Sequence, residues 1–299
     1  MNSIHLQQIF ANYIDKFEYI NGTTHSEYYK WQIAKRFRAE MDAALASPAD
    51  ELSSKLNAIK KLTSNLIDSY TQPFQGLVKF AEEEPETVRQ MFLGLYSDDG
   101  GDLEKRQKRI GEFLAKSHEL RDKYFLDSYL YKDDMHSVTS YLSLYDPDHN
   151  YIFKASHALK FADCVEFYDD WGSGESVKLD VYYRMCNQLV DAIKASPELM
   201  ATDASRFENG WGVDPDTFYP DPEKHILAFD IIYCCSTYNL FQGITFVRPK
   251  TKERQLIQEK KNKAIEFSAK MDAARKQLNE LEKAKDYMKS VLAEGIEVQ

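Results

Sequence analysis

The sequence has few of the residues that end regular structure or build disulfide and zinc frameworks. Its 299 residues include only 12 Gly, 9 Pro and 4 Cys. So little glycine and proline, together with 29% charged residues, favours helices over an all-β architecture. The cysteines form no C-x-x-C pair, so we expect buried free thiols in place of a disulfide framework or a structural zinc site. They are Cys164, Cys186, Cys234 and Cys235.

Long apolar runs and positive charge are also scarce. No stretch of about 18 apolar residues occurs, so no membrane span is expected. The segment Met1–Phe17 lacks the basic start of a signal peptide. Both absences predict a soluble cytoplasmic protein with no membrane partner. The net charge of −10 disfavours a protein that binds nucleic acid with its whole surface, although it is compatible with a local basic patch.

The common catalytic motifs are missing. The chain has no Walker A loop, no H-E-x-x-H and no G-x-S-x-G. Among the 7 His, only His149 and His157 approach metal-ligand spacing, and the hairpin expected below would separate them. Acidic pairs such as Asp133-Asp134 lie at the ends of expected elements, where solvated caps are commoner than metal sites. We therefore expect a non-enzyme without cofactor or metal, and an enzyme whose site is assembled from scattered residues is the alternative.

Apolar residues recur at helical spacing through the first 135 residues, in segments separated by loop signals such as Asn21-Gly22 and Ser97–Gly101. This pattern predicts an N-terminal helical bundle over residues 1–135. In its second helix, Tyr29 and Ile33 belong to the expected buried face. Lys30 is expected on the outer side of the same helix.

Residues 136–250 read as an α+β unit. Ser137–Tyr145 is rich in aromatic and β-branched residues, Asp146–Asn150 is a cluster of turn formers, and the apolar Tyr151-Ile152-Phe153 follows, which together predict a β-hairpin. Two amphipathic helices follow, one from Ala158 to Phe167 and one from Leu179 to Ile193.

The rest of that unit alternates between loop and apolar segments. Residues 196–222 contain repeated Pro and Gly and are expected to be irregular. His225–Leu240 is apolar on nearly all sides and predicts a buried helix, and Gly243–Val247 predicts a short last strand. The expected fold class is therefore α+β, predominantly helical, with a small central hairpin or sheet.

From about Thr251 a heptad pattern begins, which makes residues 251–299 a third expected domain. With Ile257 at position a, nine of the eleven a and d positions are apolar, and Lys260 and Lys285 are the exceptions. The pattern predicts a coiled coil, and a long helix packed on its own domain is the alternative. The expected oligomerisation contacts are Ile257, Ala264, Phe267, Met271, Leu278, Leu281, Met288 and Leu292.

Two sets of side chains are candidates for nucleic-acid contacts. Aromatic rings can stack on bases, and the candidates are Tyr141, Tyr145, Tyr151, Phe153, Trp171 and Trp211. Cations can contact phosphates, and the candidates are Lys105, Arg106, Arg109, Arg248 and Lys250. The alternatives are that the aromatics cover the sheet and that the cations are solvated or paired with carboxylates.

One stretch resembles a known family. Tyr141-Leu-Ser-Leu144, Pro147, Tyr151 and Phe153-Lys154, followed by a helix, resemble the N-terminal region of McrB-like restriction proteins, with Phe153 where the pattern has Tyr. His225–Asn239 resembles the helix that closes this region, so the resemblance covers roughly residues 90–240. It implies the recognition or adaptor part of a bacterial antiviral system, which works with an AAA+ motor and a separate nuclease. The motor itself is absent from this sequence.

Two functions follow as expectations. The first is a non-catalytic DNA-recognition or specificity module of a restriction system, with modified or unmodified DNA and an AAA+ motor or nuclease subunit as partners. The second is a coiled-coil adaptor that binds no nucleic acid and forms a homo- or hetero-oligomer through its C-terminal helix.

Overall fold

All of the regular structure in the described ranges is helical. The structure is a computed structural model that describes residues 1–293 apart from 69 and 127; side chains at 209, 210, 251 and 291–293 are left out. Within those ranges there is no β-strand, so the expected α+β class with a hairpin or sheet is wrong. The chain divides into two units, Met1–Arg248 and Pro249–Gln299. No helix in the described part is long and apolar enough to cross a bilayer.

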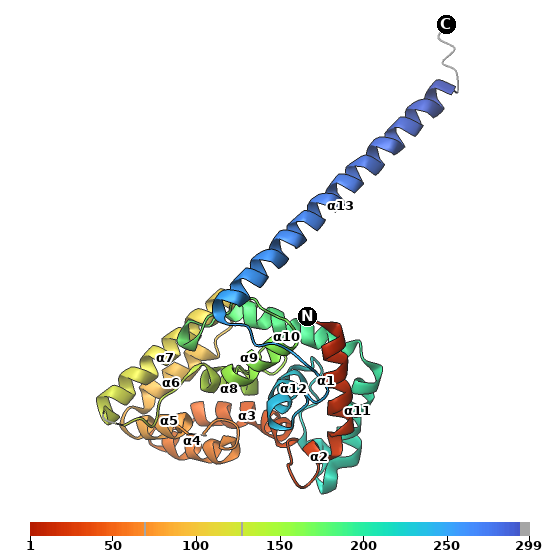
Figure 1. The fold of residues 1–299 in the computed structure, drawn as a ribbon. Helices are drawn as coiled ribbons and strands as arrows, with labels where there is room; N and C mark the ends of the chain where they lie inside the picture. Colours follow the sequence, from red (N-terminus) through yellow and green to blue (C-terminus); the bar gives the residue numbers. More distant parts are fainter. Residues whose placement is uncertain (69, 127, 294–299) are drawn as a thin grey trace. The chain divides into compact units, whose positions relative to one another are not determined.

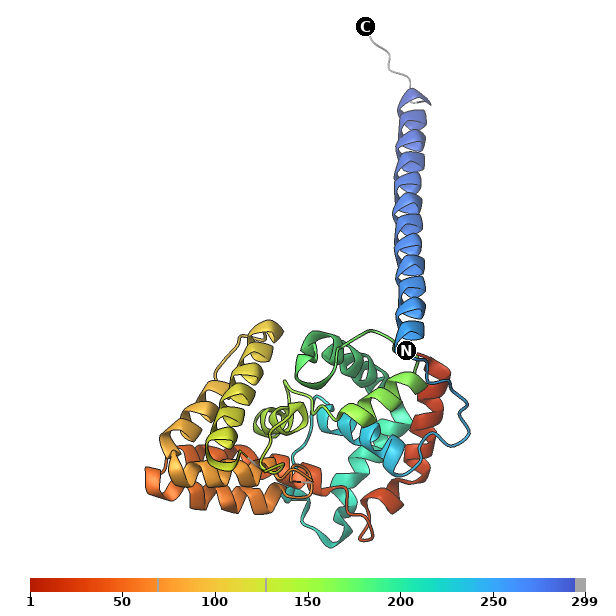
Figure 2. The same ribbon diagram turned by 60° about the vertical axis from the view of Figure 1, so that its left-hand side comes forward.

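The first unit is a compact set of helices in which most elements bury one face. Figure 1 and Figure 2 show α4–α7 gathered on one side and α1, α11 and α12 on the other, with α8 and α9 between them. The elements are α1 (Ser3–Asp15), α2 (Phe17–Asn21), α3 (Tyr29–Leu45), α4 (Ala49–Thr63), α5 (Pro73–Glu83), α6 (Pro85–Leu95), α7 (Leu103–Phe125), α8 (Met135–Tyr145), α9 (Ala155–Cys164), η1 (Gly174–Ser176), α10 (Leu179–Lys194), α11 (Pro197–Asn209), η2 (Gly210–Gly212), η3 (Pro215–Thr217) and α12 (His225–Thr237).

The first 135 residues form helices, as the sequence predicts, but they are not a separate unit. Helix α8 packs against α3 and α7, and an aromatic cluster joins it to α5, α6 and α7. The Tyr141 ring of α8 lies 5.5 Å from Phe74, 5.9 Å from Phe92 and 5.8 Å from Phe113, measured between ring centroids. Rings at these separations add to the stability that burial alone provides. No division of the chain therefore falls at residue 135.

The segment expected to be the first hairpin strand is helix α8. Asp134 caps it through a capping box, since its side chain accepts from Ser137 N and the Ser137 hydroxyl accepts from Asp134 N. The hydroxyls of Thr139 and Ser140 donate to the carbonyls four residues earlier, both at 2.6 Å, which only a helix permits. The composition of this segment predicted a strand because its helical period is hidden. The residues from Ser137 to Leu144 are all buried, and a helix buried on every side shows no 3.6-residue period.

The segment expected to be the second strand is extended, but side chains replace a partner strand. The Tyr183 hydroxyl accepts from Tyr151 N at 3.3 Å, and the Thr139 hydroxyl accepts from Phe153 N at 3.0 Å. The Tyr182 hydroxyl donates to the Ile152 carbonyl at 2.8 Å. Buried backbone groups need partners, and here α8 and α10 supply them.

Two other expectations need correction and one is confirmed. Residues 196–222 are not irregular throughout, because Pro197 begins helix α11 at a position where proline loses no helical hydrogen bond. Residues 243–247 form no strand. The all-round apolar segment is confirmed as the buried helix α12.

In the second unit, the regular structure within the described residues 249–293 is one helix, α13 (Thr251–Ala293). Its 43 residues correspond to a rod of roughly 65 Å at about 1.5 Å per residue. The expected long C-terminal helix is therefore confirmed, and its pairing with another helix remains a prediction.

Candidate functional site

Most of the aromatic side chains predicted to stack on bases lie in the core. Tyr141 is fully buried, and Tyr151 and Phe153 are each 3% exposed. Trp171 is 6% exposed and packs edge-on against Phe153 and Tyr182. None of these four rings presents a face to solvent in this structure, so each of them stabilises the fold.

Tyr145 is only half-buried, but both faces of its ring are covered. It stacks on Tyr96 with centroids 3.8 Å apart and planes inclined by 3°. The Arg38 guanidinium lies 4.9 Å from the ring centroid, and the hydroxyl donates to Asp42 at 2.7 Å. A base could stack here only by displacing Tyr96 or Arg38.

Trp211 is anchored in the same manner. Its indole N–H donates to Glu18 at 2.9 Å. Its ring stacks on Tyr28, with 5.8 Å between centroids and 6° between planes, and contacts Phe17 at 5.6 Å. These contacts explain why a half-buried Trp occupies a loop, because the ring ties that loop to the N-terminal helices.

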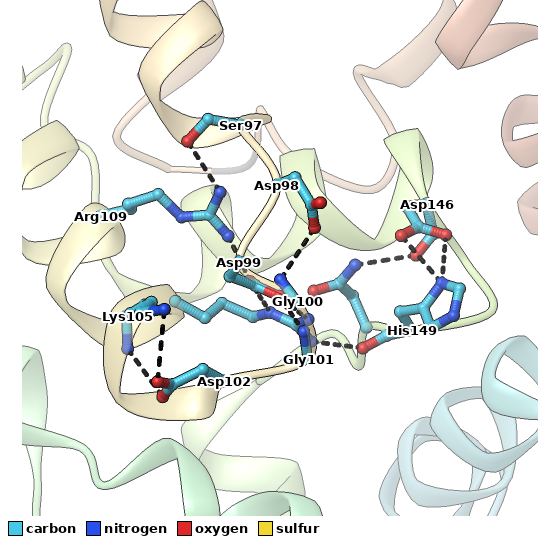
Figure 3. Close-up of polar contacts among 12 residues, drawn as sticks. Ser97, Asp98, Asp99, Gly100, Gly101, Asp102, Lys105, Arg109, Asp146 and His149 are labelled. Atoms are coloured by element: carbon cyan, nitrogen blue, oxygen red, sulfur yellow. Dashed lines mark hydrogen bonds and ion pairs between the residues drawn. The ribbon is translucent and has the colours of Figure 1, made fainter.

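The loop from Ser97 to Asp102 holds two of the predicted phosphate-binding arginines against the protein (Figure 3). Asp99 accepts from Arg106 Nε at 2.7 Å and also pairs with Arg109. The Arg106 side chain is 8% exposed and donates to the His149 carbonyl at 2.6 Å. The hydrogen bond from Arg106 holds the pKa of Asp99 at about 2, so this carboxylate stays charged and neutralises the cations beside it.

The other predicted cations are more accessible. The Lys105 side chain is 70% exposed and lies 3.9 Å from Asp102. Arg248 is 57% exposed, with Nε 3.5 Å from Asp163, and Lys250 is exposed at the start of the second unit. Among the described cavities, Arg109 lines one and Tyr145 lines another, and neither of these two contains candidates of both sets.

A buried charge network, which sequence reasoning missed, lies among α1, α3 and α12. Lys30 is 2% exposed, not on the outer side of its helix, and its ammonium lies 2.5 Å from Asp230 and 2.6 Å from Glu27. Burial lowers the pKa of Lys30, but Asp230 and its other neighbours outweigh this and leave the pKa above its usual value. The Tyr13 hydroxyl donates to the same Asp230 at 2.7 Å.

Arg206 of α11 extends the network. Its side chain is fully buried, donates to the Tyr13 hydroxyl at 3.0 Å and lies 3.3 Å from Asp203. Its guanidinium also lies over the Trp31 ring at 3.6 Å. Lys224 adds a third cation, 2.9 Å from Asp203, so the network pairs buried charges across four helices.

Of the acidic pair Asp133-Asp134, only Asp134 is the cap that the sequence predicts. Asp134 caps α8, whereas Asp133 is fully buried and accepts from Ser137 at 2.7 Å and Tyr141 at 2.8 Å. Burial raises the pKa of Asp133. Across residues 1–293, with 69 and 127 left out, no group of three or more His, Cys, Asp or Glu side chains is arranged to hold a metal ion.

The described members of the predicted oligomerisation set lie along one side of α13, and all of them except Ile257 are exposed. Ile257 is half-buried and Ala264 is exposed, and the side chain of Leu292 lies outside the described residues. The five large members are all more than half exposed: Phe267 67%, Met271 51%, Leu278 57%, Leu281 67% and Met288 64%. We refer to the stripe of a and d positions from Ile257 to Met288 as the seam.

Comparison of this chain with protein-family models, curated proteins and solved structures finds no match. The resemblance to McrB-like restriction proteins therefore stays an expectation from the residues that carry it.

Proposed function

We propose that this protein is an adaptor that assembles with another helix through α13. The observation that supports the proposal is the seam, in which large apolar side chains recur with heptad spacing on a helix that exposes them to water. Soluble proteins rarely expose contiguous apolar surface without a partner. Knobs-into-holes pairing with a second helix would bury one such stripe on each of the two helices.

The size of the effect favours pairing. Burying one Phe, Leu or Met side chain contributes roughly 1.5–3 kcal/mol, and the seam offers five large side chains that are more than half exposed. Lone helices in water gain little from propensity alone, so α13 gains most of its stability when the seam is covered.

DNA recognition is a prediction with less support. Four of its six aromatic candidates are buried, and the other two have their rings covered or anchored by neighbouring side chains. Two of its five cations pair with Asp99. A recognition role would therefore depend on rearranging these contacts.

The test uses the immobilised full chain and a lysate of cells that express it. The double variant Phe267→Ala and Leu278→Ala removes two seam side chains but keeps helix propensity. Ile265→Ala with Tyr287→Ala is the matched control, because these side chains are 66% and 71% exposed on the same helix but lie off the seam.

We expect a partner, or a second copy of the chain, that is retained by the wild type and the control and lost from the seam variant. Two losses of about 2 kcal/mol each would weaken binding by roughly a thousandfold. Identical retention by all three proteins would refute the adaptor proposal.

A further inference from the structure

The side chains that flank the seam carry mostly positive charge. In the register that begins with Ile257 at a, positions e and g lie beside the seam and face the partner helix. Between Ile257 and Ser290 these positions hold five cations and a single carboxylate. They are Lys261, Lys263, Lys270, Arg275, Lys289 and Glu282.

The carboxylates of α13 lie away from the seam. All of the other acidic residues between Ile257 and Ser290 occupy positions b and c, on the outer side of the helix: Glu259, Glu266, Asp272, Glu280 and Asp286. Two lysines, Lys260 and Lys285, lie within the seam itself at d and a. The side of α13 that meets a partner is thus apolar along its centre and basic on both flanks.

A second copy of the chain fits this surface poorly. In a parallel pair each g residue meets the e residue five positions later, so Lys270 meets Arg275 and no pair of opposite charge forms. Lys260 and Lys285 would each meet their own copy in the seam. In an antiparallel pair that overlaps the whole seam, Lys260 meets Lys285. Both orientations therefore bring lysines together where water is excluded, which is unfavourable.

Resting on the proposed adaptor function, we propose that the partner of α13 is a helix of a different protein whose own seam is flanked by Glu or Asp. Such a helix places a carboxylate opposite the basic flanks, and an acidic group facing Lys260 or Lys285 satisfies each seam lysine. Charge beside a coiled-coil seam selects partners more than it adds affinity, so this pattern specifies heteromeric pairing.

An anionic membrane surface is the competing ligand for a basic amphipathic helix. The shape of the apolar stripe favours a helix instead. A helix that lies in a bilayer interface presents a wide apolar face, whereas this seam is narrow and is interrupted by Ala264, Ala274 and the two lysines. A seam in which small and long side chains alternate can interdigitate with the side chains of another helix.

The test measures binding of the full chain to two labelled peptides by fluorescence anisotropy. One peptide copies residues 251–293. The other carries Glu in place of the seven cations in and beside the seam, and Lys in place of Glu282. The replaced cations are Lys260, Lys261, Lys263, Lys270, Arg275, Lys285 and Lys289.

We expect the charge-reversed peptide to bind at least about tenfold more tightly than the copy at ~50 mM salt, with the preference shrinking at ~300 mM. Sedimentation should show the chain alone as a monomer at low salt. Equal binding of both peptides, or a tight dimer of the chain alone at low salt, would overturn the acidic-partner proposal while supporting the adaptor function. Binding only to vesicles with anionic lipid, or to no probe, would overturn both.

A pair of variants tests the role of the seam lysines. Lys260→Leu with Lys285→Leu should let the full chain pair with itself at least about tenfold more tightly than the wild type. Lys276→Leu with Lys283→Leu removes the same charge at position f, outside the contact, and should leave the chain monomeric. If the two variants sediment alike, charge in the seam does not select the partner and the proposal fails.

Discussion

The buried pair of Lys30 and Asp230 gives the sharpest prediction about stability. Lys30→Met removes the ammonium and keeps most of the apolar stem. Asp230 is fully buried and would retain the hydrogen bond from Tyr13 but lose its cation. Glu27 would lose the same cation at 2.6 Å. Breaking a buried pair from one side leaves an uncompensated charge, which typically costs about 3–5 kcal/mol.

The assay is urea unfolding followed by tryptophan fluorescence. All 3 Trp lie in the first unit, so the signal reports on that unit alone. Lys35→Met is the matched control, because Lys35 lies on the same helix and is exposed; its effect should stay within about 0.5 kcal/mol. Adding Asp230→Asn to Lys30→Met should restore at least about 1 kcal/mol, since one of the two uncompensated charges is then gone and only that of Glu27 remains.

The outcome at neutral pH decides whether the buried ion pair contributes net stability. A variant that unfolds within about 1 kcal/mol of the Lys35→Met control at neutral pH would show that the buried ion pair contributes no net stability.

Three further outcomes are expected. Asp99→Asn should lower the free energy of unfolding at neutral pH by about 2 kcal/mol. The pKa of Asp99 is about 2 in the folded protein and higher in the unfolded chain, so the ionised carboxylate stabilises the folded state at neutral pH. Urea titrations should show that deficit shrinking as the pH falls from about 4 toward 2. Equal unfolding curves for the wild type and the variant at neutral pH would contradict the prediction. Burial raises the pKa of Asp221 to about 6, so the folded state gains stability as the protein is acidified. As the pH falls from about 7 to 4, the free energy of unfolding of the wild type should therefore rise relative to that of Asp221→Asn. A difference between the two proteins that stays constant with pH would contradict this prediction. Tyr145→Ala should leave anisotropy with unmodified, cytosine-methylated and single-stranded DNA unchanged at ~50 and ~200 mM salt, because Tyr96 and Arg38 cover the ring. Loss of binding to one of these DNA forms would favour the hypothesis that the protein is a DNA-recognition module.

Helices with one polar side could be predicted from the sequence, and of the apolar helices α8 and α12 only the longer, α12, could. Helix α4 alternates Leu52, Leu56 and Ile59 with lysines, and that period is visible directly. Helix α8 shows no such period in its sequence because the other helices of the first unit cover it on nearly every side. The local signal that identifies it is Asp134 followed three residues later by Ser137, a capping arrangement that holds whatever packs around the helix.

The charge network could be predicted only in part. Asp230 is the one carboxylate in the apolar run of α12, and a lone charge there indicates a buried partner. Its partner Lys30 lies 200 positions away, among other cations on α3 that face solvent. Without an alignment or a fold, no feature of the sequence separates Lys30 from Lys35.

The seam and the aromatic candidates differ in what their sequence pattern says about the position of a side chain. Abundant tyrosine and phenylalanine report only a tendency toward burial, and the fold uses Tyr141 and Phe153 for its own core. A heptad repeat reports geometry, because it places Phe267 and Leu278 on the same side of any helix that forms. At roughly 1.5–3 kcal/mol for each side chain, the five exposed members are unfavourable in water, and the proposed partner helix would cover them. In that proposal the lysines in and beside the seam select the partner, since an identical copy would bring cation against cation and an acidic helix would not.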